Sequence, residues 1–209
     1  MKEITTYISE KLKLSSDSKS TYKYKPKDRD ELRKMICEHI KEQGKDADLN
    51  DIDVSKVHDL SALFEDIEYG NVQVDKWDVS LVDNMSFMFS GATTFNCDIS
   101  EWNVSCCNNM NEMFAWAEDF DQDLSKWDTH AVINMEGMFK YTEKFNQDIS
   151  GWDVSNALTM DNIFKGAQAF DQDLDKWNVP SDCSTKRAFD KAAKYGEGKR
   201  PYPKWYKGK

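Results

Sequence analysis

Residues 145–164 read FNQDISGWDVSNALTMDNIF, and this order of aromatic, aliphatic and acidic residues recurs every 25 residues along the 209-residue chain. The tryptophans of the repeat are Trp77, Trp102, Trp127, Trp152 and Trp177. Twelve residues after each tryptophan stands a phenylalanine: Phe89, Phe114, Phe139, Phe164 and Phe189. Seven residues before four of the tryptophans stands another: Phe95, Phe120, Phe145 and Phe170. A fixed period of this length indicates stacked repeats, and we expect these residues to form the rows of a shared core.

Each repeat unit contains two short segments with different hydrophobic spacing. Met85, Met88, Phe89 and Ala92 follow the i, i+3, i+4, i+7 spacing of a helix face. Residues 98–104 alternate between polar and apolar, which is typical of a strand. We therefore predict an α/β repeat solenoid of the leucine-rich-repeat type, with about six 25-residue coils that each hold a short helical turn and a short parallel strand. A single unit buries too little apolar surface to offset its backbone entropy, so the coils must stack.

The repeat divides the chain into four expected parts. These are an amphipathic peptide with a Ser-rich linker at 1–21, a helical N-terminal cap at 22–51, the repeat solenoid at 52–195, and a basic aromatic tail at 196–209. The expected coils are 52–76, 77–101, 102–126, 127–151, 152–176 and 177–195. In the cap, residues 27–43 place Leu32, Met35, Ile36 and Ile40 on one helical face. This face either covers the first coil or docks a partner.

Charge and cysteine content limit the classes of function. Residues 52–176 carry 24 acidic and 7 basic side chains, a net charge of −17, whereas the whole chain carries −10. An acidic body repels phosphates, so we expect no nucleic acid at the repeats. The five cysteines form no CxxC pair, which favours reduced thiols and no metal or cofactor. No apolar run is long enough to cross a bilayer, and the N-terminus lacks the pattern of a secretory signal. We expect a cytoplasmic or virion-associated protein.

An acidic position also follows the 25-residue period. Its members are Asp98, Asp123, Asp148 and Asp173. Short carboxylates at turns usually accept hydrogen bonds from backbone N–H groups, and a row of calcium ligands is the alternative. Carboxylate pairs also serve glycosidases, so a carbohydrate-active enzyme is another alternative. Because every unit carries the carboxylate, we interpret it as scaffold and expect no enzymatic activity.

The segments FNQDISGWDVSNALTMDNIF, FNCDISEWNVS and FDQDLSKWD resemble the 25-residue repeat of the BspA-like leucine-rich-repeat surface proteins, which include mycoplasma lipoproteins and other bacterial surface proteins. The resemblance covers about residues 50–195. It implies a solenoid related to leucine-rich repeats, a role in binding or adhesion without catalysis, and a location at the cell surface. The chain shows neither the secretory signal nor the lipobox cysteine of the surface members.

We therefore predict a non-catalytic protein that binds a protein or glycan partner. The alternative is a structural or packaged phage or virion component, addressed by its N-terminal peptide. In that peptide Ile4, Ile8 and Leu12 share one helical face. Two further candidate contacts are Trp116, which falls outside the phase of the repeat, and Trp205, in the tail KRPYPKWYKGK. The aromatic residues of the tail either stack on bases or a membrane surface, or pin the tail against the last coil.

Overall fold

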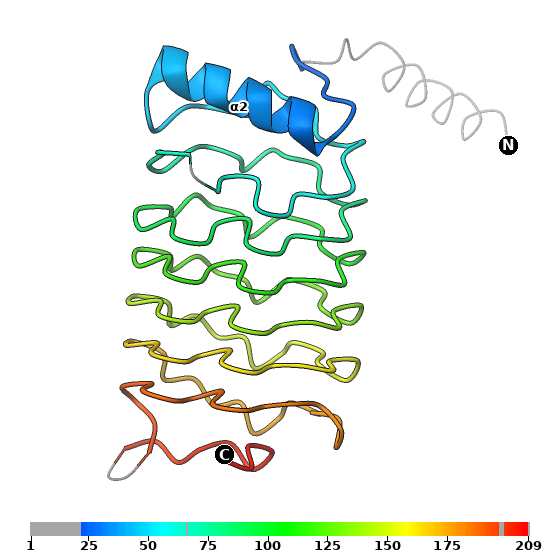
Figure 1. The fold of residues 1–209 in the computed structure, drawn as a ribbon. Helices are drawn as coiled ribbons and strands as arrows, with labels where there is room; N and C mark the ends of the chain where they lie inside the picture. Colours follow the sequence, from blue (N-terminus) through cyan, green and yellow to red (C-terminus); the bar gives the residue numbers. More distant parts are fainter. Residues whose placement is uncertain (1–21, 66, 197–198, 209) are drawn as a thin grey trace, which may run out of the picture.

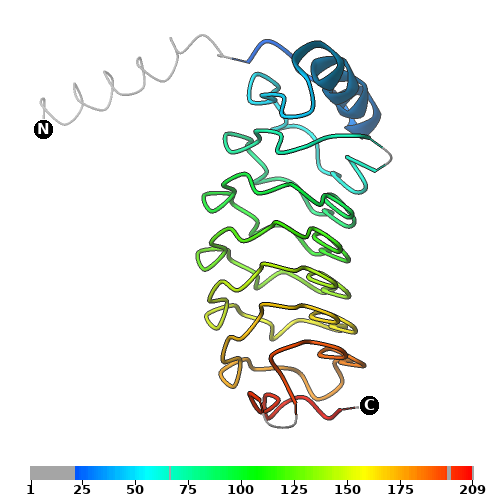
Figure 2. The ribbon, with the colours of Figure 1, turned by 90° about the vertical axis from the view of Figure 1, so that its left-hand side faces the viewer.

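The computed structural model describes residues 22–65, 67–196 and 199–208. The one helix of this part of the chain, α2 (Arg29–Gln43), lies at one end of an elongated body (Figure 1). From there the chain winds through successive circuits that stack along the long axis, and the C-terminal segment lies across the opposite end (Figures 1 and 2). We call each 25-residue circuit a layer. The candidate contacts Ile4, Ile8 and Leu12 lie outside the described residues.

Helix α2 has defined signals at both ends. Its N-cap, Asp28, accepts a hydrogen bond from the N–H of Glu31 at 2.9 Å, and the Glu31 carboxylate accepts one from the N–H of Lys27 at 3.0 Å. These two bonds satisfy N–H groups that have no partner inside the helix. Gly44 ends α2 with a φ of 93° and donates to the carbonyl of Ile40. Such a left-handed backbone is accessible to glycine at little cost.

One face of α2 closes the core at the N-terminal end. Leu32 and Ile36 are fully buried in the hydrophobic cluster that runs through the layers. On the same helix, the Arg33 guanidinium donates to the carbonyls of Ala62 and Leu63 at 3.1 and 2.9 Å. The helix thus covers apolar surface that the first layer would otherwise expose.

The predicted α/β class, with a helical turn and a strand in each of six coils, is wrong. Among the described residues α2 is the only helix, and no residue belongs to a strand of a sheet. Neighbouring layers are joined by isolated parallel bridges instead. One column of them recurs at the 25-residue period: Asp59–Asn84, Asn84–Asn109, Asn109–Asn134, Asn134–Thr159 and Thr159–Ser184.

The segment expected to be a helical turn is a series of tight turns because its N–H groups alternate between two kinds of acceptor. Met85 and Phe87 donate to Asn109 and Asn111 of the next layer, at 2.9 and 2.8 Å. Met88 donates back to Met85 within its own layer, at 3.2 Å. Phe87 also has a φ of 58°, which an α-helix does not allow. Side chains three and four residues apart therefore face the core without helical hydrogen bonds.

The segment expected to be a strand is also made of turns, because its N–H groups bond within their own layer. Trp102 donates to the carbonyl of Ile99 at 3.2 Å, and Cys107 donates to the carbonyl of Val104 at 2.8 Å. Each bond closes a turn between residues three apart, so these N–H groups do not pair with the neighbouring layer.

Stacked aromatic side chains form the centre of the body. In the central layers Phe139 lies 5.8 and 5.7 Å, between ring centroids, from Phe114 and Phe164 of the adjacent layers. Phe145 lies beside it in the same layer at 4.2 Å and continues a second row. The predicted phenylalanines occupying these two rows are all buried. Because each ring is shared between layers, no layer has a core of its own.

The tryptophans form a third row, with a hydrogen bond in every layer. Trp127, Trp152 and Trp177 stack at 6.3 and 6.4 Å between centroids. The indole nitrogens of all five donate to a backbone carbonyl 28 residues earlier, at 2.9–3.1 Å. A buried indole N–H needs such a partner, so this bond fixes the ring in each layer.

The tail closes the C-terminal end of the body. Trp205 stacks on Trp177 at 5.8 Å and donates to the carbonyl of Leu174 at 2.9 Å. It thereby takes the place that the tryptophan of a further layer would occupy. The described residues contain no helix long and apolar enough to cross a membrane.

Candidate functional site

The periodic carboxylates are hydrogen-bonded turn residues. Asp98, Asp123 and Asp148 accept from the N–H of the serine two residues on, at 3.0, 2.9 and 2.9 Å. Asp173 accepts from the N–H of Asp175 at 2.9 Å. Hydrogen bonds from those serines, through the backbone or the hydroxyl, lower the pKa of Asp98, Asp123 and Asp148. A general acid needs a raised pKa, so these three carboxylates are poorly suited to donate a proton.

A second polar row joins the layers. Its sequence pattern, an Asn or Asp after the phenylalanine of each unit, predicts acceptors for turn N–H groups but does not show that the donor lies in the next layer. Asn71, Asn96, Asp121 and Asn146 each accept from the backbone N–H exactly one period later, at 2.8–2.9 Å. The glutamines of the following layers, Gln122, Gln147 and Gln172, donate to the same side chains. The signal in the sequence was an Asn or Asp after each phenylalanine, often with a glutamine next. This row stabilises the stack and leaves few of its polar groups free for a ligand.

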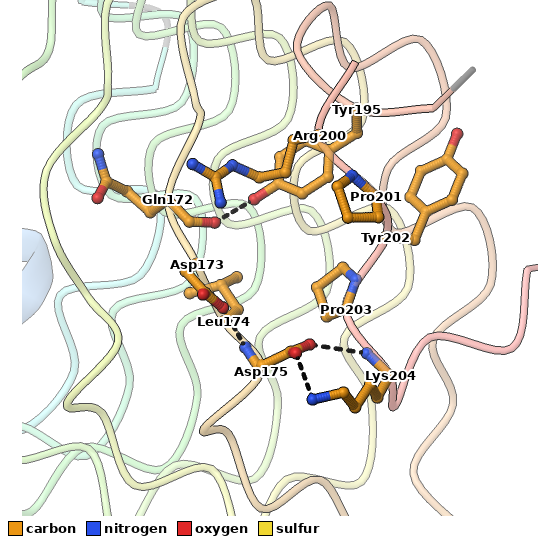
Figure 3. A pocket seen from close by; sticks show the side chains of 10 residues that line it. All are labelled: Gln172, Asp173, Leu174, Asp175, Tyr195, Arg200, Pro201, Tyr202, Pro203 and Lys204. Atoms are coloured by element: carbon orange, nitrogen blue, oxygen red, sulfur yellow. Dashed lines mark hydrogen bonds and ion pairs between the residues drawn. The ribbon is translucent and has the colours of Figure 1, made fainter. Parts of the chain in front are cut away.

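A small pocket of about 180 Å³ lies between the last layer and the tail (Figure 3). Its two cationic side chains are paired with carboxylates, and Asp173 accepts the backbone N–H bond described above. Arg200 Nε donates to Asp171 at 2.6 Å, and Lys204 Nζ lies 2.8 Å from a carboxylate oxygen of Asp175. The Tyr195 hydroxyl donates to the carbonyl of Gln172, and burial raises the pKa of that hydroxyl. These contacts hold the tail in place, and no reactive groups converge on the pocket.

The buried cysteines have environments that disfavour the reactive thiolate. All five are free thiols, and Cys97 and Cys107 are buried. Burial raises the pKa of both, to about 12 for Cys107, and the thiolate is the reactive form. Within 22–65, 67–196 and 199–208, no three His, Cys, Asp or Glu side chains are grouped as metal ligands.

The most distinctive surface feature is a pair of stacked aromatic rings outside the core. Trp116, which is 48% exposed, stacks on the half-buried ring of Tyr141 in the next layer. The ring centroids are 4.1 Å apart and the rings are inclined by 25°. We call these two residues the aromatic pair. The sequence singled out Trp116 but missed Tyr141, although the two are one period apart.

Both members of the aromatic pair have a left-handed backbone. The φ values are 63° for Trp116 and 58° for Tyr141, and the same column holds glycine in the layers on either side, at Gly91 and Gly166. This conformation costs a bulky residue of order 1–3 kcal/mol, and it recurs at other non-glycine residues such as Phe87 and Lys191, so the layers impose it on these positions. The two layers therefore carry large rings where glycine would be easier to accommodate.

The rings lean toward the C-terminal end of the body. A Cβ atom added to Gly166 would collide with the Tyr141 ring, whereas one added to Gly91 would meet nothing within 4 Å. The Lys165 ammonium lies 5.9 Å from the centroid of the Tyr141 ring. The column thus has open space beside Gly91, followed by the two rings, and a lysine of the adjacent column contacts the second ring. Trp116 itself is 48% exposed, and the space beside Gly91 is open.

Tyr202 of the tail is also exposed, at 45%, and it stacks on Tyr195 at 6.2 Å between centroids, whereas the remaining exposed large hydrophobic side chains have no aromatic stacking partner. Leu81, Ile133 and Leu158 are 50%, 44% and 58% exposed, and Phe87 is 40% exposed. Ile133 and Leu158 occupy equivalent positions in adjacent layers. Exposed apolar residues are ordinary at protein surfaces, and these residues, which have no aromatic stacking partner, serve as controls for the aromatic pair.

Stacked 25-residue layers, whose repeated polar side chains bond to the backbone of the same or the next layer, define this chain as a repeat protein. A family model described as "Mycoplasma protein of unknown function, DUF285" matches residues 31–131 and, in an overlapping second match, residues 98–202. The two matches together cover most of the chain, and the chain belongs to this family. No curated protein and no solved structure matches the chain.

Proposed function

We propose that this chain is a non-catalytic repeat protein that binds a macromolecular partner through the exposed surface of its layers. The observation that carries the proposal is the aromatic pair. Tryptophan and tyrosine are among the residues that contribute most to binding energy at interfaces. Here Trp116 has no core to fill, and it adopts a backbone conformation that is unfavourable for its size.

Two further points support binding over catalysis. The periodic carboxylates engage turn N–H groups, and the arginine and lysine of the C-terminal pocket are each paired with a carboxylate. The resemblance of the repeat to BspA-like surface proteins also supports a binding or adhesive role. The phage or virion alternative depends on residues 1–21, which lie outside the described residues, so no structural observation favours it.

Selection from ligand libraries tests the proposal. The protein would be used to select from a displayed library of random peptides and to probe a glycan array. Trp116→Ala would serve as the counter-selection protein, and Leu158→Ala, on another exposed column, as the matched control. Ligands that bind the wild type and Leu158→Ala but not Trp116→Ala are expected. If no ligand distinguishes the wild type from Trp116→Ala, the aromatic pair is not a binding site.

A further inference from the structure

We infer that the open face of Trp116 binds the guanidinium group of an arginine in a basic segment of a partner protein. This inference rests on the proposed function and adds the chemistry of the partner. It depends on three features of the aromatic pair: an uncovered indole face, an acidic surrounding, and a cation already present at the other end of the stack.

The uncovered face has the size and shape for a planar group. Tyr141 covers one face of the Trp116 indole at a centroid distance of 4.1 Å. Trp116 remains 48% exposed, and in the preceding layer a Cβ atom on Gly91 would meet nothing within 4 Å, so no side chain of this column covers the indole from that layer. A planar guanidinium stacks on such a face more readily than a tetrahedral ammonium does, and tryptophan is the best aromatic partner for a cation.

The charge of the neighbouring layers selects a cation. Residues 77–101, which include Gly91, contain four acidic side chains and no lysine or arginine. Residues 102–126, which include Trp116, contain five acidic side chains and one lysine. Lys140 lies 3.3 Å from Glu112 and Lys144 lies 2.7 Å from Asp119, so these two lysines of the next layer neutralise two of the nine carboxylates. With the one lysine of residues 77–126, the two layers keep a net charge of −6 (9 − 1 − 2). An incoming cation therefore meets an acidic surface.

The chain itself places a cation beside the aromatic pair. Lys165 lies over the ring of Tyr141, so one end of the stack already has a cation–π contact. Among the described residues, no lysine or arginine of the chain lies over Trp116. An arginine from a partner would complete the same arrangement at the open end. A neutral saccharide would also stack on an indole, but it would gain less from the acidic surface.

The test uses the full chain and three short Gly/Ser peptides that differ only in carrying arginine, lysine or citrulline. Citrulline keeps the planar shape of arginine without its charge. Binding would be followed by the NMR shift of the Trp116 indole N–H, and affinities by calorimetry. The arginine peptide is expected to shift the Trp116 signal and to bind more tightly than the other two. Trp116→Ala should weaken binding about 3- to 30-fold, the range of a single cation–π contact. Leu158→Ala should leave the affinity unchanged within about twofold.

Other outcomes separate this inference from the proposed function. If the citrulline peptide binds as well as the arginine peptide, or if a soluble oligosaccharide shifts Trp116 and the arginine peptide does not, the arginine assignment is wrong. The aromatic pair then remains a binding site for a different ligand. If neither the peptides nor any library ligand responds to Trp116→Ala, both proposals fall. Trp116→Phe, which keeps an aromatic ring at this position, should retain part of the affinity and guards against misfolding of the alanine variant.

Discussion

Replacing Phe139 by alanine is the most direct test of a core shared between layers. Phe139 is fully buried in a central layer. Its ring lies against Phe114 and Phe164 of the adjacent layers at 5.8 and 5.7 Å, and against Phe145 and Trp152 at 4.2 and 6.0 Å. The substitution would remove four aromatic contacts at once.

The size of the effect depends on whether the cavity can collapse. Phe→Ala in a core costs about 3–5 kcal/mol, and the higher values occur where the surroundings cannot relax. Backbone bonds from Phe139 to Ile163 and from Met135 to Thr159, both 2.9 Å, hold the adjacent layer at a fixed distance. The cavity should therefore persist. We expect the free energy of unfolding to fall by about 4–5 kcal/mol, a large part of the 5–15 kcal/mol typical of a folded domain.

Chemical denaturation provides the measurement. Urea unfolding would be followed by tryptophan fluorescence and by circular dichroism, and coincident curves would establish two-state behaviour. Phe87→Ala is the matched control, because Phe87 is 40% exposed and should cost less than about 1 kcal/mol. If Phe139→Ala costs no more than Phe87→Ala, with an unchanged dependence on urea, the layers do not share a continuous core.

Three further predictions concern the polar rows and the tail. Asn96→Ala removes the acceptor of an interlayer N–H bond and should cost about 1–2 kcal/mol, whereas Asn96→Asp keeps an oxygen there and should cost less than about 0.5 kcal/mol in the same urea assay. Trp205→Ala should release the tail, which limited trypsin digestion would show as faster cleavage at the C-terminal lysines; an unchanged cleavage rate would mean that Trp205 does not hold it. The folded-state pKa values of Asp98, Asp123 and Asp148 are lowered, so their stabilising contribution is complete above the unfolded pKa of about 4 and is lost as the pH falls through the folded values. The difference in urea midpoint between the wild type and the triple Asp→Asn variant should therefore shrink below about pH 4, and a constant difference between pH 6 and pH 2 would contradict this.

The sequence predicted which residues lie in rows but not the backbone that carries them. The period of 25 residues is visible in Trp77, Trp102 and their successors, because stacked layers require equivalent residues at equal intervals. The spacing of Met85, Met88 and Phe89 suits both a helix face and a chain of tight turns. Hydrophobic periodicity alone does not distinguish the two, since both bring side chains three and four residues apart to one face.

One glycine in the sequence indicates that the repeated segment around Met85 and Phe89 is not a helix. Gly137 stands one period after Glu112 and two after Phe87, and all three have a positive φ, at 61°, 48° and 58°. A glycine within an apparent helical spacing indicates a left-handed residue at that position in every layer. Of the aromatic pair, the sequence indicates only Trp116, because this residue departs from the core positions of the repeat. Comparing the residues at positions 91, 116, 141 and 166 would also have identified Tyr141.

The left-handed column that holds the aromatic pair shows how a repeat protein can carry a site without altering its fold. Gly91, Trp116, Tyr141, Gly166 and Lys191 all have φ values between 58° and 75°, although their side chains have little in common. The stacking of the layers therefore sets the backbone at this column, and the residue type does not. Bonds such as Gly91 to Ala115 and Trp116 to Lys140, at 2.7 and 2.8 Å, impose the same conformation on each layer. A side chain at this column projects from a backbone that neighbouring layers hold in place, so a ring there costs local strain but disturbs no core contact. In the proposed binding mode, the held backbone and the contact with the Tyr141 ring would order the indole before a ligand arrives, which would lower the entropy lost on binding.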